Sequence, residues 1–133
     1  MAAEKIICDT DVLIDFFDHQ QPRHQQTKNI IEMEIGMENV LISSVTRMEL
    51  LTGAANKTEL NAIQKNLARF GTILITPEID LKALELLVKY KLSHGLAFPD
   101  ALIAATAQET GLKLFTYNLK DFRFIANLNL LQH

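Results

Sequence analysis

The sequence has few of the residues that mark several special classes of protein. Its 133 residues include one cysteine, no tryptophan, three prolines and five glycines. A single cysteine cannot form an internal disulfide, which excludes a disulfide framework and favours a reducing, cytoplasmic setting. Cys8 lies within an apolar run, so we interpret it as a small core residue and not as a nucleophile.

Long hydrophobic runs and a strong charge of one sign are also absent. No apolar run approaches the ~18 residues of a membrane span, and the opening residues lead directly into a strand pattern, so we expect neither a membrane segment nor a secretory signal. The net charge of −3 argues against a protein that coats nucleic acid through charge alone. The length and the lack of repeats predict a single domain over residues 1–133.

Strand-like and helix-like segments alternate along the chain. Short apolar runs at residues 5–9, 39–43, 71–77 and 112–117 predict strands, and residues 126–132 are a candidate edge strand. The segments between these runs carry apolar residues at helical spacing, and Gly36, Gly53 and Gly111 follow three of the expected helices. This alternation predicts an α/β fold with a mainly parallel sheet.

Acidic residues stand at the edges of these segments. Asp9 directly follows the first strand, where ligands of open α/β sheets collect, although a helix cap explains it equally well. For Asp11 we favour the cap of the following helix. Glu49 lies between apolar residues in "VTRMELLTG", Asp100 opens the apolar helix "PDALIAATA", and Asp121 lies in "TYNLKDF".

Each of these acids alone has a structural explanation, as an exposed helix glutamate, a partner of the helix dipole or a turn residue. Together they are harder to explain, since several carboxylates at one sheet edge repel one another and raise each other's pKa. A hard divalent cation removes that conflict, and Mg²⁺ prefers oxygen ligands of this kind. The sequence therefore predicts a metal site that can activate water against a phosphodiester.

The segments "IICDTDVLIDFF", "SSVTRMELLTG", "FPDALIAATA" and "LFTYNLKDF" resemble, in order and spacing, the four motifs of PIN-domain ribonucleases. The similarity is greatest to the VapC-type toxins of toxin–antitoxin modules, and it covers nearly the whole chain. It implies a PIN-like three-layer α/β/α sandwich. It also implies that four acids carry catalysis and bind the metal: Asp9, Glu49, Asp100 and Asp121.

The resemblance assigns supporting positions as well. Thr116 and Asn118 match small polar residues that orient ligands or water. Asp11 stands where the family more often has Asn, so it tunes the pocket without having to bind metal. The implied activity is endonucleolytic cleavage of RNA with Mg²⁺ or Mn²⁺. The implied partners are a second copy of the chain and a small antitoxin of the VapB type. The chain would contact DNA only indirectly, through the antitoxin.

Other interpretations remain open at the level of sequence. "IICDTDVLID" also fits the opening of haloacid-dehalogenase-like phosphatases, in which Asp9 would be a nucleophile, but no later lysine motif is found. A non-catalytic Mg²⁺-binding regulatory domain and a PIN scaffold without activity are two further alternatives. Phosphate contact and simple surface charge are equally compatible with three basic residues next to the motifs: Arg47, Lys120 and Arg123.

Overall fold

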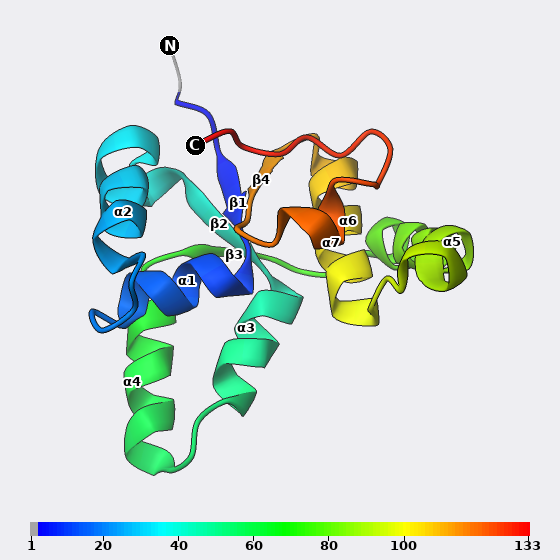
Figure 1. Ribbon diagram of the computed structural model, residues 1–133. Helices are drawn as coiled ribbons and strands as arrows, with labels where there is room; N and C mark the ends of the chain where they lie inside the picture. Colours follow the sequence, from blue (N-terminus) through cyan, green and yellow to red (C-terminus); the bar gives the residue numbers. More distant parts are fainter. Residues whose placement is uncertain (1–2) are drawn as a thin grey trace.

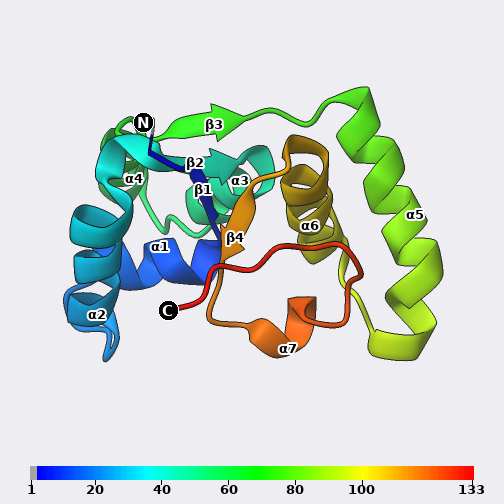
Figure 2. The same cartoon turned by 90° about the horizontal axis from the view of Figure 1, so that it is seen from above.

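The computed structural model describes residues 3–133, in which a four-stranded sheet lies between two layers of helices (Figures 1 and 2). The strand order is β3-β2-β1-β4, and every neighbouring pair is parallel. The strands are β1 (Ile6–Cys8), β2 (Val40–Ser43), β3 (Gly71–Ile73) and β4 (Lys113–Phe115). The predicted three-layer sandwich is therefore confirmed, and its sheet is wholly parallel.

Helices supply the crossovers that parallel strands require. The first half of the chain forms α1 (Thr10–Phe17), α2 (His24–Asn29), the π-helix η1 (Ile30–Ile35), the 3₁₀ helix η2 (Met37–Asn39) and α3 (Ser44–Thr52). The second half forms α4 (Lys57–Leu67), α5 (Pro77–His94), α6 (Phe98–Thr110) and α7 (Leu119–Phe122). Within residues 3–133, none of these helices is long and apolar enough to cross a membrane.

Two apolar clusters fill the space on either side of the sheet. Ile6 and Cys8 contribute to the cluster beneath α1, η1 and α4, whereas Ile7 contributes to the one that α5, α6 and α7 cover. Successive side chains of a strand point to opposite faces, which explains why β1 is apolar throughout. Four buried alanines of α6, namely Ala101, Ala104, Ala105 and Ala107, leave little bulk on that helix, so it can approach the sheet closely.

The chain departs from the sequence-based expectations at its end and near its start. Residues 126–132 form no strand, because only one isolated bridge, Leu114 to Leu130, joins them to β4. The residue that caps α1 is Asp9 and not Asp11, since the helix begins at Thr10 and Asp11 already lies in its first turn. Gly111 follows α6 as expected, in the left-handed conformation that favours glycine, at φ 71°.

Candidate active site

Asp9 lies at the carboxyl end of β1 and is almost fully enclosed, with 4% of its surface exposed. Its Oδ1 accepts a hydrogen bond of 2.8 Å from the amide of Thr10, and its Oδ2 accepts one of 2.8 Å from the hydroxyl of Thr116. The two alternatives left open for Asp9 therefore combine, because the residue caps α1 and faces the edge where the other acids gather.

Burial, together with the charges of Asp11 and Asp100, raises the pKa of the Asp9 carboxyl from 3.8 to about 7. The hydrogen bonds from Thr116 and Thr10 act in the opposite direction, because they stabilise the carboxylate form. At neutral pH Asp9 is consequently poised between its two protonation states. A cation next to it would favour the ionised form.

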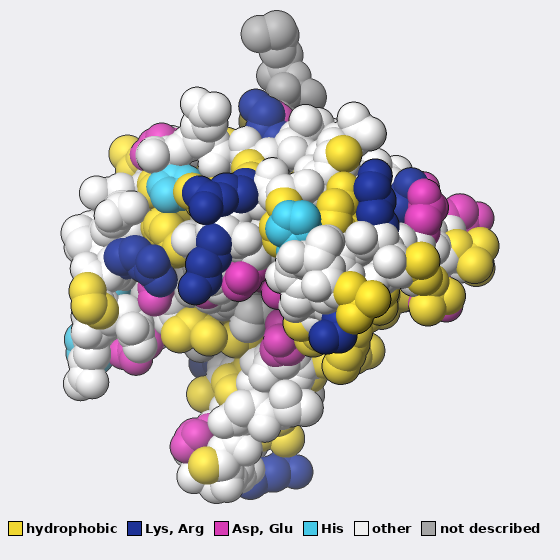
Figure 3. Space-filling model, turned by 45° about the vertical axis from the view of Figure 1, so that its right-hand side comes forward, with side chains coloured by type: hydrophobic (Ala, Val, Ile, Leu, Met, Phe, Trp, Pro, Cys, Tyr) yellow, Lys and Arg dark blue, Asp and Glu magenta, His cyan; other side chains and the backbone are white. Residues whose placement is uncertain are grey.

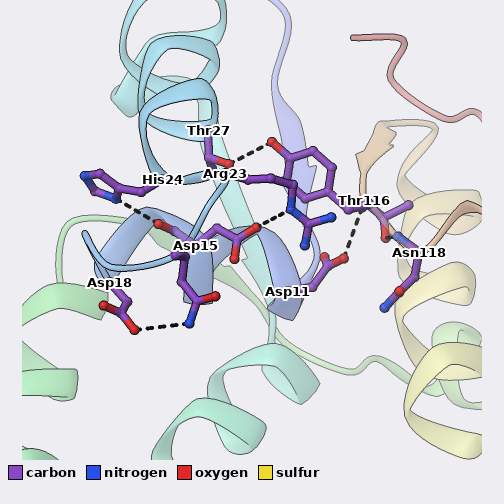
Figure 4. A network of polar contacts seen from close by, with 10 residues as sticks. Asp11, Asp15, Asp18, Arg23, His24, Thr27, Thr116 and Asn118 are labelled. Carbon is purple, nitrogen blue, oxygen red and sulfur yellow. Dashed lines mark hydrogen bonds and ion pairs between the residues drawn. The ribbon is translucent and has the colours of Figure 1, made fainter.

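Asp11 lies in the first turn of α1 and reaches the segment after β4. Its Oδ2 accepts a hydrogen bond of 3.1 Å from the amide of Tyr117 (Figure 4). Its Oδ1 is buried and has no hydrogen-bond partner among residues 3–133, and burial raises the pKa of this carboxyl. An unpartnered buried carboxylate oxygen is costly, and coordination of a cation would satisfy it.

Glu49 comes to the site from α3. The hydroxyl of Thr10 donates a hydrogen bond of 2.7 Å to Oε1 of Glu49 and lies 3.1 Å from the hydroxyl of Thr46. Ser43 ends β2 and caps α3 by accepting a hydrogen bond of 3.1 Å from the amide of Thr46. The first turn of α3 is thus fixed beside α1, while Glu49 itself remains exposed to solvent.

Asp100 and Asp121 complete the acidic group from the other side of the sheet. Asp100 lies in the first turn of α6, and its pKa is raised from 3.8 to about 6, mainly by burial. The charges of Asp121, Glu49 and Asp11 contribute to this rise, so all these carboxylates lie within electrostatic reach of Asp100. Asp121 belongs to α7, where the fully buried Phe122 anchors the helix to the core.

The two polar residues after β4 hold this edge together. Thr116 is buried, and its hydroxyl oxygen also accepts a hydrogen bond of 3.0 Å from the amide of Asn118. Asn118 therefore contributes through its backbone, and its side chain makes no hydrogen bond to residues 3–133 (Figure 4). The predicted supporting residues thus lie at the site, with Thr116 in direct contact with Asp9.

The donor set at this edge consists of carboxylate and hydroxyl oxygens, which suits a hard divalent cation. No group of three or more His, Cys, Asp or Glu side chains within residues 3–133 has the spacing of a closed metal centre. The acids therefore share one electrostatic environment without being drawn together at ligand distances. The unpartnered Oδ1 of Asp11 and the raised pKa values of Asp9 and Asp100 fit a site that a cation would complete.

Acidic side chains lie in the middle of one face of the molecule, with basic side chains beside them (Figure 3). Arg47 makes a contact within the fold, because its Nη1 donates a hydrogen bond of 3.0 Å to the hydroxyl of Thr72. Lys120 and Arg123 are exposed at α7 and just after it. Cys8 is fully enclosed, as expected for a core residue, and burial raises the pKa of its thiol.

Three residues near the site were not identified from the sequence: Thr10, Arg23 and Tyr117. The position of Thr10 between two aspartates in "DTD" was a usable signal. Arg23 lies in a polar segment with no such signal, and only the tertiary structure places its guanidinium 4.0 Å from the centre of the Tyr117 ring.

Comparison with known proteins identifies the family to which this chain belongs. The model of the PIN domain family matches residues 6–128. A toxin–antitoxin complex from Klebsiella pneumoniae contains a chain that is 31% identical, with 96% of this chain and 95% of that chain covered and a TM-score of 0.72.

Two more distant structures share the fold. DNA-bound VapBC from Salmonella typhimurium is 22% identical, with a TM-score of 0.76 and coverage of 96% of this chain and 97% of that chain. VapC20 from Mycobacterium tuberculosis is 16% identical, with a TM-score of 0.71 and coverage of 94% and 99%. No curated protein matches the sequence. The phosphatase and the Mg²⁺-binding regulatory domain would each belong to a different family. Because the match to the PIN model spans nearly the whole described chain, this protein belongs to the PIN domain family.

Proposed function

We propose that this protein is a divalent-metal-dependent endoribonuclease and the toxin of a type II, VapBC-like toxin–antitoxin module. The observation that carries the proposal is the effect that carboxylates from other segments have on the pKa values of Asp9 and Asp100. The pKa of Asp100 on α6 is raised in part by the charges of three other acids: Asp121 on α7, Glu49 on α3 and Asp11 on α1. The pKa of Asp9, which follows β1, is raised in part by the charges of Asp11 and Asp100. Clustered carboxylates of this kind are typical of metal-dependent phosphodiester cleavage.

In the proposed mechanism, four acids would hold Mg²⁺ or Mn²⁺, with Asp11 beside them: Asp9, Glu49, Asp100 and Asp121. The bound cation would lower the pKa of a water molecule and stabilise negative charge on the phosphodiester. Thr116 keeps Oδ2 of Asp9 in place, and Thr10 keeps Oε1 of Glu49 in place. Glu49 is exposed and hydrogen-bonded on one oxygen, so we assign it the acceptance of a proton from the attacking water.

The proposed partners follow from the relatives. The chain from Klebsiella pneumoniae belongs to a toxin–antitoxin complex, which supports a small antitoxin of the VapB type as a partner here. VapC20 is described as a toxin that cleaves the sarcin–ricin loop, which supports RNA as the substrate class. We also propose that the protein is a cytoplasmic homodimer and that it contacts DNA only through the antitoxin.

The test is cleavage of RNA by the purified protein, free of any antitoxin. Total cellular RNA is incubated with Mg²⁺, with Mn²⁺ or with EDTA, and the new RNA ends are mapped by sequencing. We expect a small set of discrete cuts that require the divalent ion and are lost in Asp9→Asn. Equal cutting by Asp9→Asn and the parent, or cutting that persists in EDTA, would contradict the proposal.

A further inference from the structure

Arg23 lies in the loop between α1 and α2, and two neighbours fix its side chain. Its Nε donates a hydrogen bond of 2.8 Å to Oδ2 of Asp15, a buried residue of α1. The guanidinium lies over the ring of Tyr117, 4.0 Å from the ring centre (Figure 4). The Tyr117 hydroxyl is itself hydrogen-bonded to the buried Thr27 at 2.7 Å, so the platform under the guanidinium is rigid as well.

The loop that carries Arg23 is also held firmly. Asp18 accepts hydrogen bonds from the amide of Gln20 at 3.0 Å and from Nε2 of Gln21 at 3.1 Å. The ring of His24 is hydrogen-bonded through Nδ1 to the carbonyl oxygen of Asp15 at 2.9 Å. A ligand that binds Arg23 would therefore not have to order this segment, which lowers the entropic cost of binding.

Tyr117 connects Arg23 to the acidic site. The amide of Tyr117 donates to Oδ2 of Asp11 while the guanidinium lies over the Tyr117 ring, so Arg23 is joined to Asp11 through a single residue (Figure 4). The acidic site thus has a fixed positive charge at its edge.

The contacts of Arg23 leave part of the guanidinium available. Asp15 occupies Nε, the two terminal nitrogens make no hydrogen bond to residues 3–133, and the side chain is 46% exposed. Two adjacent terminal N–H groups in a plane match two oxygens of a phosphate. The two terminal nitrogens of Arg23 therefore remain available to a ligand while the Asp15 and Tyr117 contacts hold the side chain.

We propose that Arg23 binds a backbone phosphate of the RNA beside the acidic site. This inference rests on the proposed function, since it concerns how the RNA of that reaction is held. The carboxylates of the acidic site would by themselves repel a polyanion. A guanidinium preset at its border would offset this repulsion and fix the position of the strand, whatever its base sequence.

The experiment measures binding separately from cleavage. A fluorescein-labelled, mixed-sequence single-stranded RNA of about 20 nucleotides, longer than the ~4–16 nucleotides of a typical single-strand binding site, is titrated in Ca²⁺ at several salt concentrations, and its length is checked on a gel afterwards. For Arg23→Gln we expect binding at least ~10-fold weaker, as for the loss of a charge-assisted hydrogen bond. The slope of log affinity against log salt should fall by about one phosphate contact. Arg23→Lys should bind with intermediate affinity, because it keeps the charge but loses the planar pair of donors.

Arg69→Gln is the matched control, because Arg69 also lies over aromatic rings, 5.8 Å from the centres of Phe16 and Phe17, but these lie at the end of α1 away from Asp11. It should bind RNA like the parent. Since Arg23→Gln leaves the Asp15 carboxylate without its partner, the double variant Asp15→Asn/Arg23→Gln restores a neutral pair and should fold while still binding weakly.

The outcomes separate this inference from the proposed function. If the parent cleaves RNA and both Arg23→Gln and the double variant bind with parental affinity and salt slope, the role of Arg23 is refuted and the nuclease stands. If loss of Arg23 weakens binding but the parent cuts no RNA in any divalent ion, the phosphate contact stands and the proposed activity is refuted. A parent that binds no RNA refutes the role of Arg23 outright.

Discussion

The hydroxyl of Thr116 donates a 2.8 Å hydrogen bond to Oδ2 of Asp9, although the two residues are 107 positions apart in the sequence. They meet because β1 and β4 are neighbours in a parallel sheet, so that the residues just beyond both strands share one edge. The bond fixes one oxygen of an almost fully enclosed acid and leaves the orientation of this carboxylate little freedom. The site therefore depends on the pairing of the two strands as much as on the acids themselves.

Removing the charge of Asp9 or Asp100 should remove activity but not the fold. We expect Asp9→Asn and Asp100→Asn to lower the cleavage rate by at least ~100-fold, because each would lose a metal ligand that carries several kcal/mol of transition-state stabilisation. Thermal unfolding should change little, since amides replace carboxylates whose pKa values show that ionisation is disfavoured in the folded protein. RNA cleavage and circular dichroism check the two statements.

The control for these variants is Asp80→Asn, because Asp80 is an exposed acid in the first turn of α5. It should cleave RNA at the parental rate. Loss of activity in this control would mean that overall charge, and not the site, governs the rate.

Thr116 should act as a positioning residue. Thr116→Val keeps the shape but removes the donor to Asp9, and we expect ~10–100-fold weaker metal affinity or activity, as for other groups that orient a ligand. Thr116→Ser keeps the hydroxyl and should restore most of the loss. Calorimetric titration with Mn²⁺ measures the affinity independently of cleavage. Equal Mn²⁺ affinities for the valine and serine variants would contradict the role of the hydroxyl.

Metal-free protein should become less stable as the pH rises from about 4 to about 7. The carboxyls of Asp9 and Asp100 have pKa values near 7 and near 6 in the folded protein, compared with 3.8 for an aspartate in the unfolded chain. Between these values the folded state binds more protons than the unfolded state, so the free energy of unfolding falls with increasing pH. Urea unfolding in EDTA at pH 5, 6, 7 and 8 measures this trend.

Mg²⁺ should counteract the same trend, because a cation that binds only the folded state stabilises it, and it binds the deprotonated carboxylates. The Asp9→Asn variant should show a weaker pH dependence in EDTA than the parent. A metal-free stability that rises between pH 5 and pH 7, in both the parent and Asp9→Asn, would show that these two carboxyls do not ionise as described.

Phe122 should couple the core to the site. It is fully buried next to Asp121, so Phe122→Ala should lower the free energy of unfolding by about 3–5 kcal/mol through the cavity it leaves. Phe122→Leu should cost less and still reduce cleavage, because α7 and Asp121 lose their fixed position. The control is Phe98→Leu, since Phe98 is 67% exposed. Parental cleavage by Phe122→Leu at full folding would contradict the coupling.

Much of this architecture could be predicted from local patterns. Strand and helix periodicity predicted the alternation of elements, and the four motifs put the candidate acids after β1 and on α3, α6 and α7, where the structure has them. The two predictions that were wrong concern the residue at which a helix begins and the pairing of a segment with a neighbouring strand. Asp11 was predicted as a cap because a cap at Asp9 or at Asp11 fits the same letters, and the choice depends on which residue starts the helix. Residues 126–132 alternate like a strand but form only one bridge to β4.

Sequence alone determined the order of elements and the burial of β1 on both faces, because hydrophobic period is a local property, and residue chemistry made the acids candidates for a metal site. Tertiary structure decided which oxygens are paired and which are left free, because hydrogen bonds such as Thr10 to Glu49 and Tyr117 to Asp11 join residues far apart in the chain. It also decided that Arg23 lies over Tyr117, whose amide binds Asp11, since stacking and charge act through space and cannot be seen in the spacing of residues along the sequence.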